Sequence, residues 1–371
     1  MIKSKTSRLI AARNALARPA LLGLLIVAAA AVSCARLAGR DLPWLPETVG
    51  LAAYPGPDLL IDIPTARAKL AVGARVIDVR ARDEYTSGHL PGAINIPARL
   101  WRSAEPQLQL FHVDGDPEQP FDIARYERLL GDRGITQDDE VIIYGSPGRD
   151  MAVAVPLFVL DWLGHERKHL IDGDAVQLWA AAGGTLELAR SRLEMTTYKA
   201  ARPRADIVWD RRQVRQVALS VKEQDVVLWD CRHPDVYQGK FIITGAKRAG
   251  HIPQAVNFDM FDLFREDITF QTRFYHEMAI LLGKKGISKD KQIVIYCHSG
   301  AAATHCYLVL RMMDYPRVAI YDNSWLEWGN DVKAVAREKR GELKIETAPS
   351  PATPAAEPQA PKTRDWWSPR T

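Results

Sequence analysis

The stretch IVIYCHSGAAATHCYLVLRMM, residues 293–313, decides the fold of this chain. Its first four residues, 293–296, are apolar or β-branched and are typical of a short buried strand. Residues 304–313 follow the spacing of a helix, and a short loop of small residues separates the two. A strand, a loop and a helix in this order predict one unit of a parallel sheet whose strands are joined by crossover helices.

The same pattern occurs a second time in the chain. Residues 141–144, VIIY, match residues 293–296 at a shift of 152, and Asp78 matches Asp230 at the same shift. Self-similarity at a fixed spacing indicates repeated structural units. We therefore expect two related α/β domains.

The rest of the chain divides around these two copies. We expect a first domain over residues 58–190 and a second over 205–345, joined by a polar linker, 191–204. Residues 34–57 would form a second linker. Residues 346–371 are rich in proline and alanine, and such a composition predicts a disordered tail.

Composition excludes several classes of protein. Of 371 residues, 25% are charged and 47% are hydrophobic, as in ordinary globular proteins. The formal charge is +4, but residues 1–33 carry five basic side chains and no acidic ones, so the rest of the chain carries −1. No basic surface for nucleic acid is expected. The only long apolar run lies near the N-terminus, which excludes a protein with several membrane spans.

The N-terminus has the features of an export signal. Residues 1–18 are basic, and residues 20–33 form an apolar stretch of about 14 residues, too short for a span of about 20. Ala31-Val32-Ser33-Cys34 resembles a bacterial lipoprotein cleavage box, although leucine is usual where Ala31 stands. We predict a lipid on Cys34 and a periplasmic location, with the outer membrane favoured by Ala35. The alternatives are a plain signal peptide and an uncleaved anchor.

The strongest candidate for chemistry is Cys297. It lies between the C-terminus of a strand and the N-terminus of a helix, where open parallel sheets bind ligands. A helix N-terminus has unpaired N–H groups and a partial positive charge, which favour a thiolate. Gly300 and the small residues around it allow the backbone to curl into an anion cradle. Such a thiolate could attack a sulfur or phosphorus centre; the alternative is a buried structural cysteine.

Several ordered motifs together resemble a known family. These are the paired Asp-x-Arg segments at Asp78 and Asp230, the Gly-His-Leu/Ile-Pro segments 88–91 and 250–253, the loop 297–303, and YDNSWLEWG at 321–329. Over residues 58–345 the chain resembles the tandem rhodaneses, which are thiosulfate and 3-mercaptopyruvate sulfurtransferases. The resemblance implies two tandem α/β domains, each a five-stranded parallel sheet flanked by helices. It also implies that the second domain is active and the first inactive, because Gly145 stands where the cysteine would be.

The resemblance implies a mechanism without cofactor or metal. Cys297 would take a sulfane sulfur from thiosulfate, a persulfide or a polysulfide, and the resulting persulfide would pass it to cyanide or a thiol. The groups expected to bind the donor are those of the loop and one cation: His298, Ser299, Gly300, Ala301, Ala302, Ala303 and Arg248.

Departures from the family pattern bear on the donor. The pair after the cysteine is His298-Ser299, which matches neither the cationic pair typical of thiosulfate enzymes nor Gly-Ser. Pro97 stands where mercaptopyruvate enzymes have an acidic partner, and Val236 stands where many members have arginine. Lys247 and Arg248 are then the nearest replacement cations, with a solvated loop charge as the alternative for Arg248. We expect weak use of thiosulfate and mercaptopyruvate, and better use of less charged donors.

Other singled-out residues are expected to be structural. Asp230, Arg232 and His251, like Asp78, Arg80 and His89 in the first copy, should tie loops together through charge-assisted hydrogen bonds. Cys231 follows Asp230 and should point to the opposite face of its strand. Cys306, inside the helix, is expected to be a core residue. With Cys34 modified, three cysteines remain, so at least one thiol is free.

Two other classes of function stay open at this point. The first is a non-catalytic rhodanese-like module that binds a sulfur anion or a protein partner. The second is a cysteine phosphatase or arsenate reductase, which the length of the loop after Cys297 disfavours because the related phosphatases have one more loop residue.

Overall fold

A computed structural model describes residues 51–56, 58–102, 122–148, 150–220, 225–265 and 269–330. The predicted signal segment 1–33, the predicted lipidation site Cys34 and the predicted tail 346–371 lie outside these residues. Within the described part, no helix has the length and apolar character needed to cross a bilayer.

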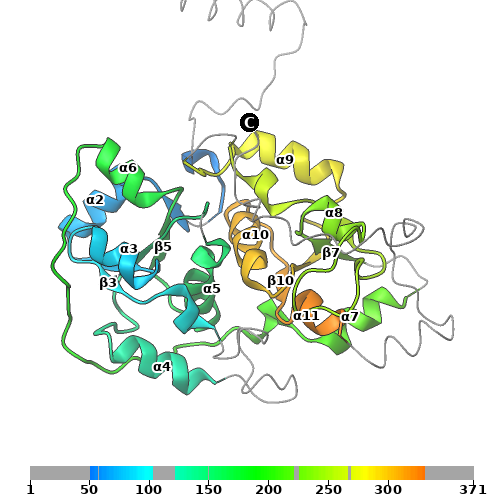
Figure 1. Cartoon of the computed structure of the whole chain (residues 1–371), viewed down its shortest axis with the longest axis horizontal. Helices are drawn as coiled ribbons and strands as arrows, with labels where there is room; N and C mark the ends of the chain where they lie inside the picture. The colour runs from blue at the N-terminus through cyan, green and yellow to red at the C-terminus, as the bar shows by residue number, and fades with distance from the viewer. Residues whose placement is uncertain are drawn as a thin grey trace, which may run out of the picture. The chain divides into compact units, whose positions relative to one another are not determined.

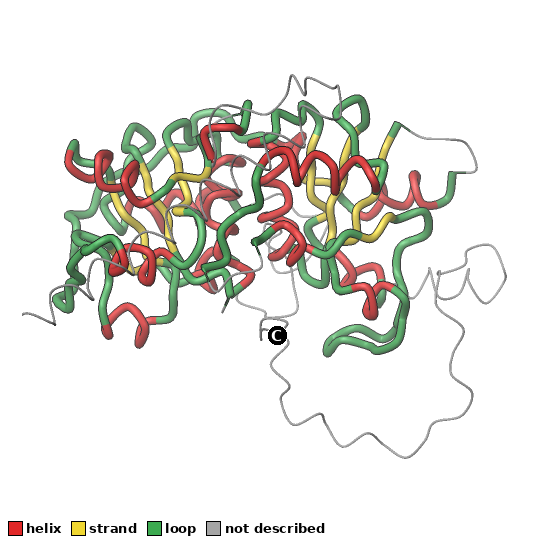
Figure 2. Tube along the Cα trace, turned by 90° about the horizontal axis from the view of Figure 1, so that it is seen from above, coloured by secondary structure: helices red, strands yellow, loops and turns green. Residues whose placement is uncertain are grey.

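The described residues form two parallel sheets, each of five strands. The strand order is β1-β5-β4-β2-β3 in the first repeat and β6-β10-β9-β7-β8 in the second. Figure 2 shows the strands as two separate groups with helices around each. The predicted fold, two tandem α/β domains with five-stranded parallel sheets, is confirmed.

The elements of the two repeats follow each other in the same order. The strands of the first sheet are β1 (Leu60–Ile61), β2 (Arg75–Asp78), β3 (Ile94–Asn95), β4 (Val141–Tyr144) and β5 (Lys168–Ile171). Its helices are α2 (Ile63–Ala71), α3 (Arg82–Ser87), α4 (Ile123–Gly131), α5 (Val155–Trp162) and α6 (Ala175–Ala181) (Figure 1). The strands of the second sheet are β6 (Val208–Trp209), β7 (Val226–Asp230), β8 (Val256–Asn257), β9 (Gln292–Tyr296) and β10 (Val318–Tyr321). Its helices are α7 (Arg211–Ala218), α8 (Pro234–Tyr237), α9 (Tyr275–Lys284), α10 (Ala301–Met312) and α11 (Ser324–Trp328). Short 3₁₀ helices are η1 (Leu51–Ala53), η2 (Ala98–Trp101), η4 (Met151–Ala154), η5 (Ala205–Ile207) and η6 (Met260–Leu263).

The central strands explain why the sequence reads as continuous apolar runs. All four residues of β4 are buried, as are residues 293–296 of β9. A parallel sheet is covered by helices on both faces, so its central strands carry apolar side chains on both faces and show no alternation of polar and apolar residues. The helices between them begin at aspartates: Asp62, Asp122, Asp174 and Asp210 each accept a hydrogen bond from a backbone N–H of the first turn.

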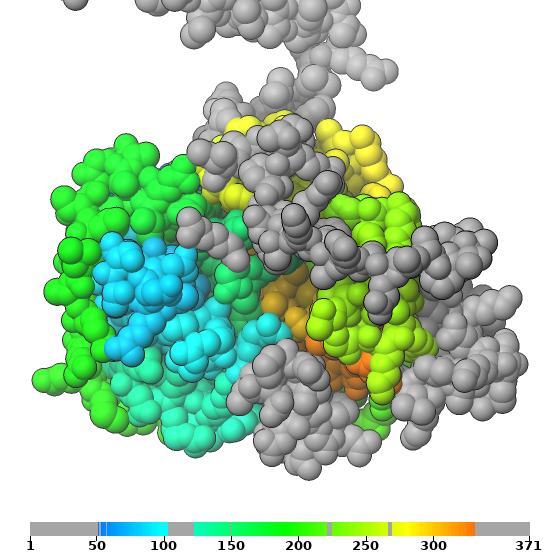
Figure 3. Space-filling view, viewed as in Figure 1, coloured from blue at the N-terminus to red at the C-terminus, as the bar shows by residue number. Residues whose placement is uncertain are grey.

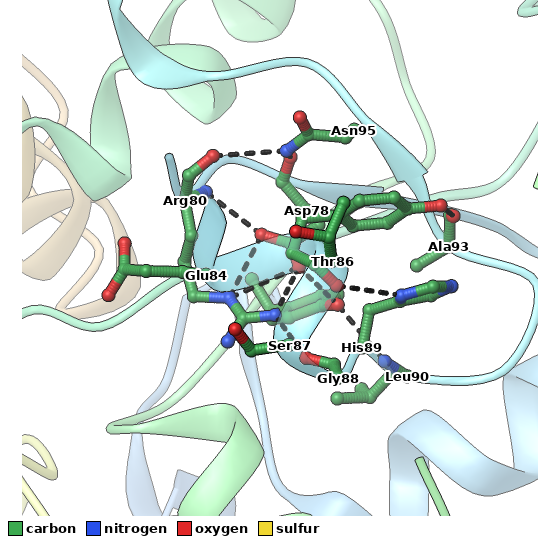
Figure 4. A network of polar contacts seen from close by, with 12 residues as sticks. Asp78, Arg80, Glu84, Thr86, Ser87, Gly88, His89, Leu90, Ala93 and Asn95 are labelled. Atoms are coloured by element: carbon green, nitrogen blue, oxygen red, sulfur yellow. Dashed lines mark hydrogen bonds and ion pairs between the residues drawn. The ribbon is translucent and has the colours of Figure 1, made fainter. Parts of the chain in front are cut away.

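A buried arginine–aspartate pair closes the end of one strand in each sheet. Arg80 donates to both carboxylate oxygens of Asp78 and also to the carbonyl of Gly88 (Figure 4). Asn95 bridges the same turn by donating to the carbonyls of Asp78 and Arg80. The charges are removed from water, so each partner needs the other, and losing one costs about 3–5 kcal/mol in such pairs.

The second sheet repeats this network residue by residue. Arg232 donates to Asp230 with Nε–Oδ distances of 2.9 and 3.1 Å, and to the carbonyl of Gly250 at 2.9 Å. Asn257 donates to the carbonyls of Asp230 and Arg232. His251 contacts the carbonyl of Tyr237 through Nδ1 at 2.8 Å. These contacts hold the loop after β7, which lies beside the end of β9.

Helix α10 is the most deeply buried helix of the second repeat, because it packs against η4 and α5 of the first. Tyr307 of α10 donates to Asp161 of α5 at 2.5 Å, and its ring meets Phe158 edge-on. Figure 3 shows only a small area of the gold-orange atoms that include α10. The helix that follows Cys297 is therefore held by both repeats.

The segment 191–204, which we expected to be a polar linker, packs on the first repeat. Thr196 donates its backbone N–H to the carbonyl of Gly131, and Tyr198 is buried with its hydroxyl 3.1 Å from His165. Arg204 closes the segment with a backbone hydrogen bond to Trp162. Residues 191–204 thus form an ordered connection that is hydrogen-bonded to the first repeat.

Candidate active site

The candidate site is built at the C-terminal end of β9, where Cys297 immediately follows the strand. Gly300 caps the N-terminus of α10 in the left-handed region, with φ 84° and ψ −25°. Residues with a Cβ adopt this region only at a cost, so glycine lets the chain reverse direction here. The reversal turns successive N–H groups of the loop and the helix toward the cysteine.

A second segment, the start of α11, holds the loop through hydrogen bonds. The backbone N–H of Cys297 donates to Ser324 Oγ at 3.2 Å. The backbone N–H groups of Trp325 and Leu326 donate to the carbonyls of Cys297 and His298 at 3.1 and 2.9 Å. Ser324 itself has φ 53°, an unfavourable value for a residue with a side chain. Such strain is typical of functional sites, where surrounding contacts hold it in place.

The sulfur of Cys297 is surrounded by donors. Burial alone would raise the pKa of this thiol, but hydrogen bonds from the Cys231 thiol and from the backbone N–H groups of Ala303, Ser299 and Ala302 lower it to about 6. These donors stabilise the thiolate far more than the thiol. At neutral pH Cys297 is therefore mainly a thiolate, which is the nucleophilic form.

Arg102 of the first repeat reaches the loop of the second. Its guanidinium donates to the carbonyl of Ser299 at 3.1 Å. Arg125 of α4 positions Arg102 by donating to its carbonyl. Within the described part of the chain, the buried Nε of Arg102 has no hydrogen-bond partner. Arg102 was not predicted from the sequence, because nothing local in the sequence connects residue 102 with residue 299.

Arg232 supplies a second positive charge beside the loop. Burial opposes its charge, but Asp230 outweighs that effect and raises the pKa of Arg232, with a further contribution from Cys297. Among the described residues, its buried Nη1 has no hydrogen-bond partner. Arg232 is therefore both a structural tie, as predicted, and a neighbour of the reactive sulfur.

Arg248, the cation that we predicted for the substrate, hydrogen-bonds to the end of a helix. Its guanidinium donates to the carbonyls of Trp328 and Gly329, at the C-terminus of α11. Arg248 thus serves the end of a helix, where positive charge is favourable. Its role toward the substrate stays a prediction, which is tested below against Arg102.

His298 is half-buried, with Nε2 at 3.0 Å from the carbonyl of Thr244. Burial lowers the pKa of His298, the charges of Arg232 and Arg102 act in the same direction, and the contact with Thr244 opposes them. The imidazole is therefore mainly neutral at pH 7, and it offers the site no positive charge there.

Three thiols meet at this site. Cys231 and Cys306 are fully buried, and they belong to the same core cluster as Cys297. Burial, followed by hydrogen bonds to Cys297 and Cys306, raises the pKa of Cys231, which stays protonated. Cys231 does lie on the face opposite Asp230, and that face is the one that carries Cys297.

The equivalent position in the first repeat has no room for a cysteine. A Cβ added to Gly145 would lie 2.5 Å from Cγ2 of Val153 and 2.9 Å from Cγ2 of Val79. Both distances are shorter than any van der Waals contact. The first repeat keeps the fold of the site without a nucleophile.

The arrangement suits a thiolate that attacks an anionic donor. Backbone N–H groups surround the sulfur, Arg102 contacts the same loop and Arg232 lies nearby, so negative charge that develops there is stabilised. Within the described residues, no group of three or more histidine, cysteine or acidic side chains could hold a metal ion.

Comparisons with known proteins identify the family of this fold. The Rhodanese-like domain family matches residues 64–181 and 214–331. The sulfur carrier protein TtuD of Thermus thermophilus is 30% identical over 291 residues, which cover 75% of this chain and 95% of that protein. A thiosulfate sulfurtransferase of Pseudomonas aeruginosa is 28% identical over 297 residues, 78% of this chain and 95% of that protein.

A solved structure shares the fold at lower identity. The anaerobic ergothioneine biosynthesis enzyme from Chlorobium limicola, in complex with trimethyl histidine, superposes with a TM-score of 0.65 and 22% identity. The match covers 79% of this chain and 71% of the other. At this identity the likeness concerns the fold.

The lowered pKa predicts how the reactivity of Cys297 depends on pH. The rate of its alkylation by iodoacetamide should rise with pH around a midpoint of about 6, because only the thiolate reacts. Mass spectrometry of the Cys297 peptide gives the rate, and the Cys306 peptide in the same sample is a buried control. A midpoint near the value of about 8.5 for a free cysteine would contradict the proposed cradle.

Proposed function

The chain belongs to the rhodanese family of sulfurtransferases, and we propose that it moves a sulfane sulfur from thiosulfate or a related donor to a thiophilic acceptor through a persulfide on Cys297. The observation that carries this proposal is the lowered pKa of Cys297, held by three backbone N–H groups and a neighbouring thiol. A non-catalytic binding module would have no need for a thiolate.

In the first step the Cys297 thiolate attacks the outer sulfur of thiosulfate. A bond forms between Cys297 Sγ and that sulfur, the sulfur–sulfur bond of thiosulfate breaks, and its electron pair leaves with sulfite. The outer sulfur of the new persulfide carries negative charge. The N–H groups of Ser299, Ala302 and Ala303, which already donate to Cys297, are placed to stabilise that charge.

Arg102 supports this step by its position on the loop. Thiosulfate is a dianion, and the contact of Arg102 with Ser299 leaves its Nε without a partner in the described part of the chain. A guanidinium with spare N–H groups is well suited to sulfur oxyanions. We propose that Arg102 is the cation that binds the donor, in place of Arg248.

In the second step an acceptor removes the sulfur. A thiolate or cyanide attacks the outer sulfur, the persulfide bond breaks, and its electron pair returns to Cys297 Sγ. The thiolate is thereby restored for the next cycle, and no cofactor is required. The same donors that stabilise the resting thiolate make Cys297 a good leaving group.

We also propose that the chain is exported and held at the periplasmic side of a bacterial membrane by a lipid on Cys34, with the outer membrane favoured. The support is the basic segment 1–18, the apolar segment 20–33 and the small residues that precede Cys34. An enzyme placed there would meet small sulfur donors before they enter the cytoplasm.

The thiosulfate:cyanide assay tests the proposed function. The purified protein should form thiocyanate and sulfite, and Cys297→Ser should abolish both products, because a serine alkoxide is not available at neutral pH. Cys306→Ser is the matched control, since that thiol is equally buried but takes no part in the reaction. Unchanged turnover in Cys297→Ser would refute the proposal.

Arg102 and Arg248 can be separated by their effect on thiosulfate. A hydrogen bond to a charged group contributes about 1.5–3 kcal/mol, so Arg102→Gln should lower kcat/KM for thiosulfate about 10- to 100-fold. Arg248→Gln should change it less than threefold. For a persulfide or polysulfide donor, which carries less charge than the thiosulfate dianion, the Arg102→Gln effect should be smaller. A larger effect of Arg248→Gln would make Arg248 the substrate cation.

The lipid anchor can be tested in a bacterial host. The full chain should incorporate radiolabelled palmitate and sediment with membranes, whereas Cys34→Ser should remain unlabelled. Cys297→Ser, which keeps Cys34, should label as strongly as the wild type. Label retained by Cys34→Ser would contradict the proposal.

A further inference from the structure

Cys231 and Cys297 are neighbours at the ends of two adjacent strands. In the pairing of β7 with β9, Asp230 lies opposite Tyr296. Cys231 and Cys297 immediately follow these two strands, and the N–H of Cys231 donates to the carbonyl of Tyr296 at 3.0 Å. The Cys231 thiol donates to Cys297, so the two side chains point to the same face.

The first repeat shows independently that side chains at these two positions meet. Val79 has the place of Cys231, because its N–H donates to the carbonyl of Tyr144 at 3.0 Å. A Cβ added to Gly145, which has the place of Cys297, would lie 2.9 Å from Cγ2 of Val79. In the second repeat both positions are cysteines.

This geometry is compatible with a disulfide. Adjacent strands lie about 4.8 Å apart, and the Cα atoms of a disulfide are usually about 4.4–6.8 Å apart. The pair is reduced in the structure, and both thiols are buried. The Cys231 thiol already donates to Cys297, so the two sulfur atoms face each other.

We propose that Cys231 is a resolving thiol, which discharges the loaded enzyme as sulfide when no external acceptor arrives. This proposal rests on the persulfide of the proposed function. The sulfur of Cys231 attacks Cys297 Sγ, and a disulfide forms between the two cysteines. The bond from Cys297 Sγ to the outer sulfur breaks, and that sulfur leaves with the electron pair and the proton of Cys231. The two thiols are oxidised and the sulfane sulfur is reduced to sulfide, so no further oxidant is needed.

The discharge must be slow relative to ordinary transfer. Burial raises the pKa of Cys231, so at neutral pH almost all of it is thiol, the less nucleophilic form. An external thiolate or cyanide therefore reaches the outer sulfur first when it is present. Without an external acceptor, the proximity of Cys231 to Cys297 favours attack by Cys231. The resulting disulfide inactivates the enzyme until a dithiol reduces it.

The test uses the full chain, reduced and then freed of reductant, with excess thiosulfate and no acceptor. Sulfite and sulfide are measured over time, and peptides are mapped by mass spectrometry after alkylation in acid. The wild type should release up to one sulfide per chain and yield a peptide pair linked through Cys231 and Cys297. Dithiothreitol should restore its activity.

Two variants and one control make the result decisive. Cys231→Ser and Cys231→Val, the latter matching Val79 of the first repeat, should each lower the sulfide formed per sulfite at least tenfold and keep the persulfide on Cys297. Cys306→Ser should behave as the wild type. Sulfite without sulfide or disulfide in the wild type would overturn this inference and leave the sulfurtransferase intact, and so would a disulfide to Cys306. Absence of sulfite would overturn both proposals.

Discussion

A negative charge on a buried sulfur is the constraint on which the second domain depends. Desolvation disfavours the Cys297 thiolate, and only several donors aimed at one atom reverse this. Three of them are backbone N–H groups, which must converge without help from side chains. Three features hold these N–H groups in place: the left-handed turn at Gly300, the hydrogen bond from Cys297 to the strained residue Ser324, and the packing of α10 against the first repeat.

The two repeats show how one fold supports a site in one copy and none in the other. Both keep the buried pair of arginine and aspartate at a strand end, with the same asparagine bridge and the same contact to a glycine carbonyl. These ties stabilise loops and leave the chemistry to neighbouring positions. In the first repeat Val79 and Val153 fill the space that the second gives to sulfur. The first repeat instead contributes Arg102 and the surface that buries α10.

The proximity of Cys231, Cys297 and Cys306 changes the interpretation of these three cysteines. Taken singly, Cys231 and Cys306 are small core residues, and the structure agrees that they are buried. Together with Cys297 they form a polarisable cluster, in which the Cys231 thiol donates a hydrogen bond to the sulfur of Cys297. The character of the nucleophile is thus a property of the loop and of the Cys231 thiol, and no single residue determines it.

Local and periodic features can be obtained from the sequence: the repeat at a shift of 152, the α/β fold, the strand–loop–helix around Cys297, and the Asp-x-Arg ties. The elements follow from propensity and short-range spacing, and the repeat follows from the recurrence of the same pattern along the chain. The distant groups that reach the sulfur are known only from the tertiary structure. Arg102 lies 197 residues from Ser299, and Cys231 becomes a neighbour of Cys297 only through the register of β7 with β9. Register and domain packing are set by many long-range contacts at once, so neither can be obtained from the residues around the site.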